Sequence, residues 1–341
     1  MFSEQRRLDV HNKQSKHTFA FIAGGIILYF LSGAVDELRV YQGASIAVYV
    51  IAISSIILLT GYSGQVSLGH GALMAVGAYA AAVARIELNT PIILCFVIAV
   101  LVAAIGGALL GAAAARLSGP YLAGATLALA IGLPSLANQF SILGGEQGLL
   151  FDVGFPPLSL GEEFTQYKWF FWIAALAALI SMWAVKNILG SRYGRTWRAI
   201  RGNEVAAQLC GINIARSKIL AFTISAGIAG LAGAMLSMTI GTVSPSAFTL
   251  ALSFSLLTGA VLSGVTTLGG VMIGAVVLVA IPEIADSVAN RLGSSERVTT
   301  NLPGFLVSAL LIMTVLFVPN GPVEQFRAHK VKKANSKLEK K

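Results

Sequence analysis

Charged residues are scarce in this sequence. Asp, Glu, Lys and Arg make up 11% of the 341 residues, against roughly 25% in soluble globular domains, while 56% of the residues are hydrophobic. A water-soluble globule is excluded, because most of the chain falls in apolar runs long enough to cross a bilayer. The length of the chain therefore reflects the number of membrane spans and not the number of soluble domains, and we interpret the chain as one polytopic membrane domain.

Cysteine and histidine are also sparse. The two cysteines, Cys95 in an apolar run and Cys210 in a basic loop, offer no disulfide framework and no cysteine-based metal site. Of the four histidines only His70 falls at membrane level, and neither H-x-x-x-H nor H-E-x-x-H spacing occurs, so we expect no metal site. The serine-hydrolase string G-x-S-x-G is absent as well. An intramembrane enzyme is therefore disfavoured.

A phosphate-binding loop is missing too. The chain contains no G-x-x-x-x-G-K-[ST] string and no Gly-Lys pair, so it cannot cradle the phosphates of ATP. Carboxylates are scarce within the apolar runs, where Glu283, beside Pro282, lies near the outer end of its run, and this leaves a proton-coupled or ion-coupled transporter few residues to work with. An ATP-driven transporter would need ATP and Mg²⁺ on a separate motor subunit, and this chain is expected to be neither an enzyme nor a cofactor-binding protein.

The apolar runs themselves predict the fold class. In lipid every backbone polar group must be satisfied within its own element, so each run should be a helix, and we expect an all-α protein with about ten transmembrane helices. The run at 19–35 follows a basic stretch and resembles a signal sequence, but its length favours an uncleaved first helix. The ten predicted spans are residues 19–35, 43–60, 66–84, 92–115, 121–140, 169–188, 217–240, 249–265, 270–290 and 302–318.

Basic residues predict the orientation, because Lys and Arg are retained on the cytoplasmic side during insertion. With both termini inside, 19 of the 24 Lys and Arg residues fall on the cytoplasmic side. The net charge of +9 is then explained by topology and by anionic membrane lipids, so no nucleic acid is expected as a partner. The predicted organisation is a cytoplasmic tail at 1–18, a membrane domain at 19–320 with an outer loop at 141–168 and a cytoplasmic loop at 187–216, and a basic cytoplasmic tail at 321–341.

Small residues mark several spans. The strings GGALLG at 106–111 and GGVMIG at 269–274 both contain GxxxG, which lets helix backbones approach closely. We therefore interpret both strings as packing motifs. The span at 217–240 carries a further face of small residues at Ala226, Ala229, Gly230 and Gly233.

A polar, glycine-rich string, GYSGQVSLGHG at 61–71, interrupts the second and third spans. Glycine permits irregular backbone, and irregular backbone at membrane depth is tolerated only inside protein or against a watery cavity. The string therefore indicates either part of a translocation path or an ordinary cytoplasmic turn.

The basic loop carries its own helical pattern between residues 194 and 213. Gly202 and Asn203 predict a break and an N-cap, and Gly211 predicts a helix stop. Such short amphipathic helices suit either a docking surface or a loop held on the membrane by positive charge. Four apolar residues alternate with charged and polar ones in this loop: Trp197, Ile200, Val205 and Leu209.

The strings GYSGQVSLGHGALMAVGAYAAA, GRTWRAIRGNEVAAQLCGINIARSKILAF and SAGIAGLAGAM together resemble the branched-chain amino-acid permease family of bacterial ABC importers, specifically its M-type (LivM) subunit, over residues 43–320. The resemblance implies a multi-pass inner-membrane permease that works by alternating access. It also implies four kinds of partner: a homologous second permease (H-type, LivH), two cytoplasmic ATPase subunits, a periplasmic or lipid-anchored substrate-binding protein, and membrane lipids.

In such permeases the basic loop carries a signature in which a short helix inserts into a cleft of the ATPase. Ala206, Ala207 and Gly211 match this signature, while Val205 stands at the glutamate position with Glu204 beside it. The small side chain of Ala207 is expected to allow close approach to the cleft wall. The residues assigned to ATPase coupling are Arg198, Asn203, Glu204, Ala206, Ala207 and Gly211.

The substrate implied by the resemblance is leucine, isoleucine or valine. A path for a zwitterion with an apolar side chain needs hydrogen-bonding groups without fixed charge, but the same groups would pass urea or short amides, and an ion-coupled secondary transporter remains a third alternative. The candidate residues of the path are Tyr62, Gln65, Ser67, His70, Asn138, Gln139, Ser253, Ser255 and Thr258.

Overall fold

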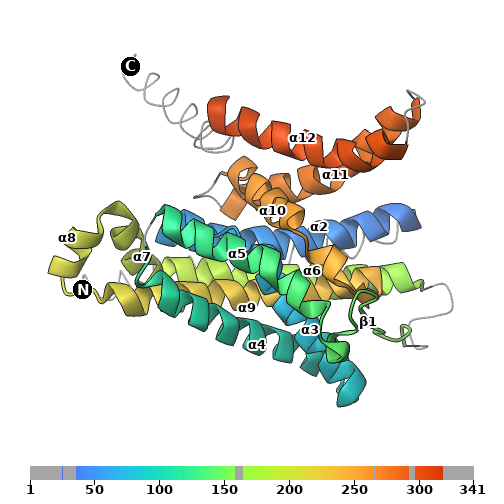
Figure 1. The fold of residues 1–341 in the computed structure, drawn as a ribbon, viewed down its shortest axis with the longest axis horizontal. Coiled ribbons are helices and arrows are strands. Elements are labelled where there is room, and N and C mark those ends of the chain that lie inside the picture. Colours follow the sequence, from blue (N-terminus) through green and yellow to red (C-terminus); the bar gives the residue numbers. More distant parts are fainter. Residues whose placement is uncertain are drawn as a thin grey trace, which may run out of the picture.

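The protein is a bundle of long helices (Figure 1). The computed structural model describes residue 25 and residues 36–117, 119–157, 164–264, 266, 268–291 and 296–317. The α-helices in this part of the chain are α2 (Glu37–Ile56), α3 (His70–Glu87), α4 (Ile92–Ala114), α5 (Pro120–Ala137), α6 (Gln166–Gly190), α7 (Arg192–Gly202), α8 (Glu204–Leu209), α9 (Ile214–Ile240), α10 (Leu250–Leu262), α11 (Val271–Arg291) and α12 (Glu296–Phe317).

Shorter elements join or extend these helices. A π-helix, η1 (Ile57–Tyr62), continues α2 without a break, and the 3₁₀ turns are η2 (Ser141–Leu143), η4 (Pro245–Phe248) and η5 (Leu268–Gly270). The two-residue strands β1 (Leu149–Leu150) and β2 (Thr242–Val243) pair antiparallel, with Leu149 opposite Val243. This pair ties the loop after α5 to the end of α9 at one end of the bundle, while α7 and α8 lie at the other end (Figure 1).

The helices agree with the predicted all-α membrane fold. Each predicted span from residue 43 onward coincides with a helix, whereas the span 19–35 and the tails 1–18 and 321–341 lie outside the described residues apart from Gly25. The two shorter apolar helices are Leu250–Leu262 and Leu302–Thr314. Six helices in the described part are long and apolar enough to cross a membrane: Glu37–Tyr62, Ile92–Ala114, Pro120–Ala137, Gln166–Gly190, Ile214–Ile240 and Leu268–Ala289.

The start of the third span differs from the prediction. The span was expected to begin at residue 66, but α3 begins at His70, and the residues just before it are not helical. One reason is that the N–H of Leu68 bonds to Thr126 of α5 and the N–H of Gly69 bonds to the Ser67 hydroxyl, in place of helical partners.

Helix α9 is the centre of the packing, with α4, α3 and α2 against it. The contacts are made through small residues: a methyl group at Gly77 of α3 would overlap the backbone of Gly230, and one at Gly107 of α4 would overlap Ala226 and Phe222. Both the small-residue face of α9 and the GGALLG string are therefore confirmed as packing motifs. In lipid, where no hydrophobic effect drives helices together, such close approach supplies the dispersion contacts that do so.

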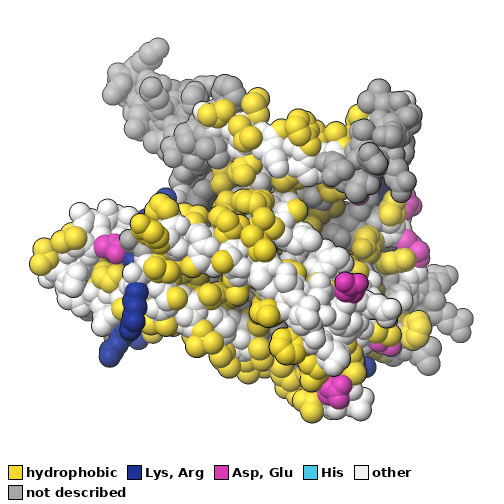
Figure 2. Space-filling model, in the orientation of Figure 1, with side chains coloured by type: hydrophobic (Ala, Val, Ile, Leu, Met, Phe, Trp, Pro, Cys, Tyr) yellow, Lys and Arg dark blue, Asp and Glu magenta, His cyan; other side chains and the backbone are white. Residues whose placement is uncertain are grey.

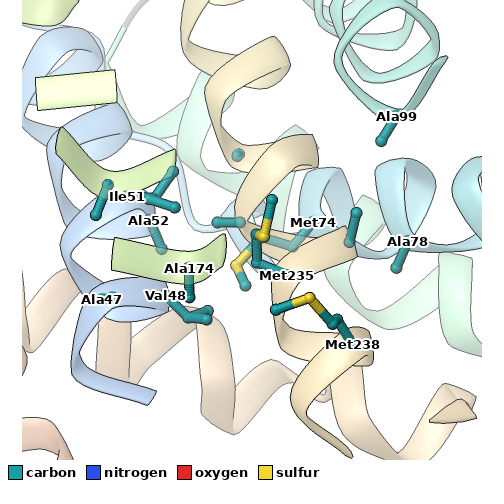
Figure 3. Packing of buried hydrophobic residues seen from close by; sticks show 14 of the residues in the cluster. Ala47, Val48, Ile51, Ala52, Met74, Ala78, Ala99, Ala174, Met235 and Met238 are labelled. Atoms are coloured by element: carbon teal, nitrogen blue, oxygen red, sulfur yellow. The ribbon is translucent and has the colours of Figure 1, made fainter. Parts of the chain in front are cut away.

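Larger side chains fill the spaces that the small residues leave. Met74, Met235 and Met238 lie between α3 and α9, facing Val48 and Ile51 of α2, and Ala174 of α6 closes the same cluster (Figure 3). Flexible thioether side chains suit such irregular gaps.

The outer surface of the bundle is apolar. On α4, Ile93, Ile105 and Leu109 are each more than 60% exposed. Figure 2 shows hydrophobic side chains over the middle of the bundle, basic side chains at the end that carries α7 and α8, and most of the acidic ones at the opposite end. An apolar band between charged ends is what a multi-pass membrane protein presents to lipid and to neighbouring subunits.

The packing on α9 can be tested with one methyl group. Gly230→Ala places its Cβ against Ala103 and the backbone of α4, so we expect a loss of about 1–3 kcal/mol from overpacking and a lower thermal midpoint of the purified protein in detergent. Gly132→Ala is the matched control, because nothing lies within 4 Å of a Cβ at that helical glycine of α5. Equal midpoints for the two variants would contradict the packing described here.

Candidate functional site

An irregular segment, Ser63–Gly69, separates η1 from α3. Ser63, Gln65 and Ser67 are at most 4% exposed, whereas Val66, between them, is 44% exposed. This alternation is typical of extended backbone, so one edge of the segment faces the bundle and the other faces the outer surface of this chain.

The segment runs from the end of the bundle into its interior. At its start, Gly64 lies beside Arg201 of α7, and at its finish, Gly69 packs on Thr126, nearly two turns into α5. Added Cβ atoms at Gly69 and Gly71 would lie 2.6 Å from the Thr126 carbonyl oxygen and 2.7 Å from Ser253 Oγ. Glycine is therefore needed for close approach, and of the two readings of this string, the surface turn does not fit.

Side-chain hydroxyls accept hydrogen bonds from the backbone at the end of this segment and in the first turn of α3 that follows it. The N–H of Leu68 donates to Thr126 Oγ1 at 3.0 Å, and the N–H of Gly71 donates to Ser253 Oγ at 3.0 Å. Within the segment, the N–H of Gly69 donates to Ser67 Oγ at 3.3 Å. Helices α5 and α10 thus replace the hydrogen bonds that the interruption of the helix removes.

His70 closes the segment as the first residue of α3. Its ring Nε2 lies 3.0 Å from Ser225 Oγ, and the Ser225 hydroxyl donates to the carbonyl of Ser55 at 2.8 Å. Because the Ser225 hydroxyl has only one proton and donates it to the Ser55 carbonyl, it can only accept a hydrogen bond from His70. The imidazole proton is therefore assigned to Nε2. Nδ1 is then a buried acceptor without a protein partner among the described residues.

The remaining path candidates lie in three places. Tyr62 is half-buried and donates from its hydroxyl to the Thr266 carbonyl at 3.1 Å. Thr258 is buried and bonds within α10, to Phe254, and Ser255 is half-buried on the same helix. Asn138 and Gln139 are exposed just beyond the end of α5, on the side of the outer loop and apart from the cluster around His70.

Three residues that make these contacts and those of the basic loop were not predicted. Thr126 and Ser225 bond to residues 58 and 155 positions away, and Lys218 pairs with Glu204 across the turn between α8 and α9. A lone hydroxyl or lysine in or beside an apolar run was the available signal, but such residues more often bond to their own helix, as Thr126 also does through the Leu122 carbonyl.

The basic loop at 187–216 forms two short helices as predicted. Ser191 Oγ caps α7 by accepting from the N–H of Tyr193, and Asn203 Oδ1 caps α8 by accepting from the N–H of Ala206 at 3.0 Å. Gly211 ends α8 with φ +82°, a conformation that other residues rarely adopt. The predicted break, cap and stop are confirmed.

The apolar residues of this loop do not share one face. Trp197 and Ile200 of α7 are buried, and Trp197 Nε1 donates to the Ser217 carbonyl at 3.0 Å. Val205 and Leu209 of α8 are instead 68% and 85% exposed. The cap at Asn203 reorients the chain between the two helices, so α7 packs on the bundle and α8 presents its apolar residues outward.

The expectation for Ala207 is also wrong in its direction. Ala207 was expected to face a partner's cleft wall, but it is 4% exposed and faces this chain. Its small side chain allows α8 to lie close to the rest of the loop, and a larger residue would clash inside the subunit.

Glu204 holds α8 to the bundle. Its Oε1 lies 2.7 Å from Nζ of Lys218, near the start of α9, and the Lys218 side chain is 7% exposed while that of Glu204 is 52% exposed. A buried ammonium needs a counter-charge, and Glu204 supplies it while also placing a negative charge in the first turn of α8.

Two arginines of α7 reach the end of η1. The Arg201 guanidinium donates from Nη1 to the Gly61 carbonyl, and the Arg198 guanidinium lies over the Tyr62 ring, 5.9 Å from its centroid. The basic loop and the irregular segment are thus in direct contact.

The sequence of this chain is similar to those of known transport permeases. Residues 41–315 match the family model described as the branched-chain amino acid transport system permease component. LivM of Escherichia coli K12, named as a high-affinity branched-chain amino acid transport system permease, is 32% identical over 259 residues, which is 70% of this chain and 61% of LivM. LivH of Salmonella typhimurium LT2 is 27% identical over 325 residues, 89% of this chain and 98% of LivH.

A more distant similarity reaches a sugar permease. The xylose transport system permease XylH of Haemophilus influenzae is 32% identical over 143 residues, 35% of this chain and 38% of XylH. No solved structure matches the chain. The matched region spans 61% of the length of the LivM relatives.

The ion pair of Glu204 predicts the stability of α8. Glu204→Gln leaves the Lys218 ammonium without a counter-charge, and we expect α8 amides to exchange hydrogen roughly fivefold faster, equivalent to about 1 kcal/mol for a half-exposed pair. The double variant Glu204→Gln, Lys218→Met should recover most of the protection, because no buried charge remains. Unchanged exchange over residues 203–211 in the single variant would show that the pair does not hold the helix.

Proposed function

Because the chain belongs to the family of branched-chain amino acid transport permease components, we propose that it is one permease subunit of a binding-protein-dependent ABC importer in the bacterial inner membrane. With a homologous H-type permease it forms the path for leucine, isoleucine and valine. Two cytoplasmic ATPase subunits bind ATP and Mg²⁺ and drive transport, and a periplasmic or lipid-anchored binding protein delivers the substrate.

The observation that carries this proposal is the irregular segment Ser63–Gly69. Its inner edge is bonded to α5 through Leu68, and the first turn of α3, which follows it, is bonded to α10 through Gly71, but Val66 on the outer edge is exposed on this chain. Backbone without helical hydrogen bonds cannot face hydrocarbon, so a second protein subunit or a water-filled path has to cover this edge. A permease that pairs with a homologous subunit around a central path meets this requirement.

The segment also has the chemistry that a zwitterion with an apolar side chain requires. Its polar side chains are hydroxyls and an amide, with the His70 imidazole directly after them and the exposed Val66 beside them. Neutral hydrogen-bonding groups can replace part of the substrate's hydration without trapping its charges. Urea and short amides fit the same groups, which makes them the alternative substrates.

The two ends of the bundle suit docking partners on opposite sides of the membrane. The α7–α8 end carries the basic loop and the exposed Val205 and Leu209, which suit insertion into a hydrophobic cleft of an ATPase. In the proposed topology of ten spans this end and both termini are cytoplasmic, and the β1–β2 end faces the periplasm and the binding protein.

An ion-coupled transporter fits less well. Among the side chains that the structure describes, no Asp or Glu is buried, and the buried Lys218 is paired with Glu204 near the start of α9. Proton and ion relays normally use carboxylates inside the membrane. ATP hydrolysis on partner subunits therefore remains the proposed source of energy, and this chain supplies no enzymatic activity.

Substrate uptake tests the proposal directly. Liposomes that contain this chain, its H-type partner and both ATPases, with the cognate binding protein on the outside, should accumulate labelled leucine only when ATP is inside. Excess isoleucine or valine should compete with leucine, and urea should not. Competition by urea alone would overturn the substrate class, whereas uptake driven by an ion gradient without ATP would overturn the ABC assignment.

Orientation can be tested with the natural cysteines. Cys210 at the end of α8 is exposed and Cys95 is buried, so a membrane-impermeant maleimide should label the chain in inverted vesicles and leave it unlabelled in spheroplasts. As a control, Phe155→Cys in a Cys210→Ser background should show the opposite pattern, since Phe155 is 84% exposed beyond β1. Labelling of Cys210 in spheroplasts would invert the proposed topology.

A further inference from the structure

The carbonyl of Gly61 receives a hydrogen bond from outside its own helix. The last carbonyls of a helix have no partner within it, and here the nearby N–H of Gln65 donates to Leu59 instead, at 3.3 Å. The Arg201 guanidinium of α7 donates to Gly61 across 140 positions of sequence. One long side chain of the basic loop therefore fixes the point at which the helix gives way to the irregular segment.

The same side chain also packs on the first turn of the segment. An added Cβ at Gly64 would lie 3.0 Å from Arg201 Cγ and 3.3 Å from Arg201 Cβ, and Gly64 has φ +74°. Glycine is thus required at this position both for its conformation and for the approach of the arginine stem. Arg198 adds a second contact over the ring of Tyr62.

The helix that carries Arg201 is firmly attached to its neighbours. Trp197 anchors α7 through the Ser217 carbonyl, and the pair of Glu204 and Lys218 anchors α8 to the same end of α9. A displacement of α8 would therefore also move α7 and Arg201, because the hydrogen bond of Trp197 and the ion pair of Glu204 join both short helices to the start of α9.

The element on the receiving side lacks the continuous hydrogen-bond ladder of an α-helix. It consists of a π-helix, which is rare and frequent at functional sites, and a segment whose backbone bonds partly to side-chain hydroxyls. Switching elements commonly have this character, because two arrangements of similar free energy are available to them.

We propose that Arg201 is the positioning residue that transmits movement of α7 and α8 to the segment Ser63–Gly69, and so opens or closes the path at this segment. The inference rests on the proposed function, since it assigns to one contact the coupling of ATP hydrolysis to transport. Arg201 acts through Gly61 and Gly64 and does not touch the substrate.

The test is a separation of two rates in the reconstituted complex. Arg201→Ala should lower leucine uptake roughly tenfold, while ATP hydrolysis stays within about twofold of the wild type and the ATPases still co-purify. Arg195→Ala is the matched control, because Arg195 lies on the same helix, has the same charge and bonds only to the nearby Gly190 carbonyl. Arg201→Lys retains a donor and a long stem, and it should recover part of the uptake.

A second measurement reports on the segment itself. Val66→Cys in a Cys210→Ser background places a thiol on the exposed edge, where its rate of labelling by a small maleimide should differ between the nucleotide-free complex and the complex trapped with ATP and vanadate. Arg201→Ala should abolish this difference, and Arg195→Ala should leave it intact.

The outcomes separate this inference from the proposed function. If the wild-type complex shows no ATP-dependent uptake, the proposed function fails. If the wild type transports but Arg201→Ala transports equally well, or loses the ATPases on purification, or keeps the nucleotide-dependent labelling at Val66→Cys, then Arg201 is not the coupling contact and the inference is overturned.

Discussion

A break in helical hydrogen bonding inside an apolar bundle is the constraint on which the rest of this structure depends. Between Ser63 and Gly69 the backbone has no continuous helical hydrogen bonds, and its N–H and C=O groups need other partners because lipid provides none. Thr126 accepts from the N–H of Leu68, and Ser253 accepts from the N–H of Gly71 at the start of α3. The lack of side chains at Gly69 and Gly71 allows the backbone to come this close to α5 and α10. The small-residue contacts between α3 and α9 keep these two helices close together, so that His70 of α3 lies within hydrogen-bond distance of Ser225 of α9. The exposed outer edge of the segment then requires a neighbouring subunit or water.

The basic loop packs firmly on this chain through one face and exposes apolar residues for a partner on the other. Helix α7 buries Trp197 and Ile200 in this chain, and Ala207 lets α8 pack closely, while Val205 and Leu209 remain exposed. A helix with an inner face fixed by an ion pair and an outer face free for a partner can transmit a force without deforming. The direct contact of Arg201 with the start of the irregular segment gives that force a short route into the bundle.

The candidate path residues are divided between two levels of the bundle. Gln65, Ser67, His70 and Ser253 gather around the irregular segment, whereas Asn138 and Gln139 lie exposed beyond α5, near the outer loop. In the proposed importer the first group corresponds to a gate reached from the cytoplasmic loop, and the second to the side from which substrate arrives. Neutral polar groups at both levels are consistent with a substrate that carries no net charge.

Local properties of the sequence determined much of this protein. Long apolar runs had to be helices, because only a helix satisfies its own backbone in lipid, and Asn203 and Gly211 determined a cap and a stop through the conformations that these residues favour. The sequence contains no P-loop string, and the proposal that partner subunits bind ATP starts from this observation. The tertiary structure alone decided that α3 begins at His70, that Lys218 pairs with Glu204 and that Ala207 faces inward. Such features depend on contacts between separate helices. The start of α3, for example, depends on the bonds of Leu68 to Thr126 and of Gly71 to Ser253, and the periodicity of one helix does not indicate which side chain of another helix will contact it.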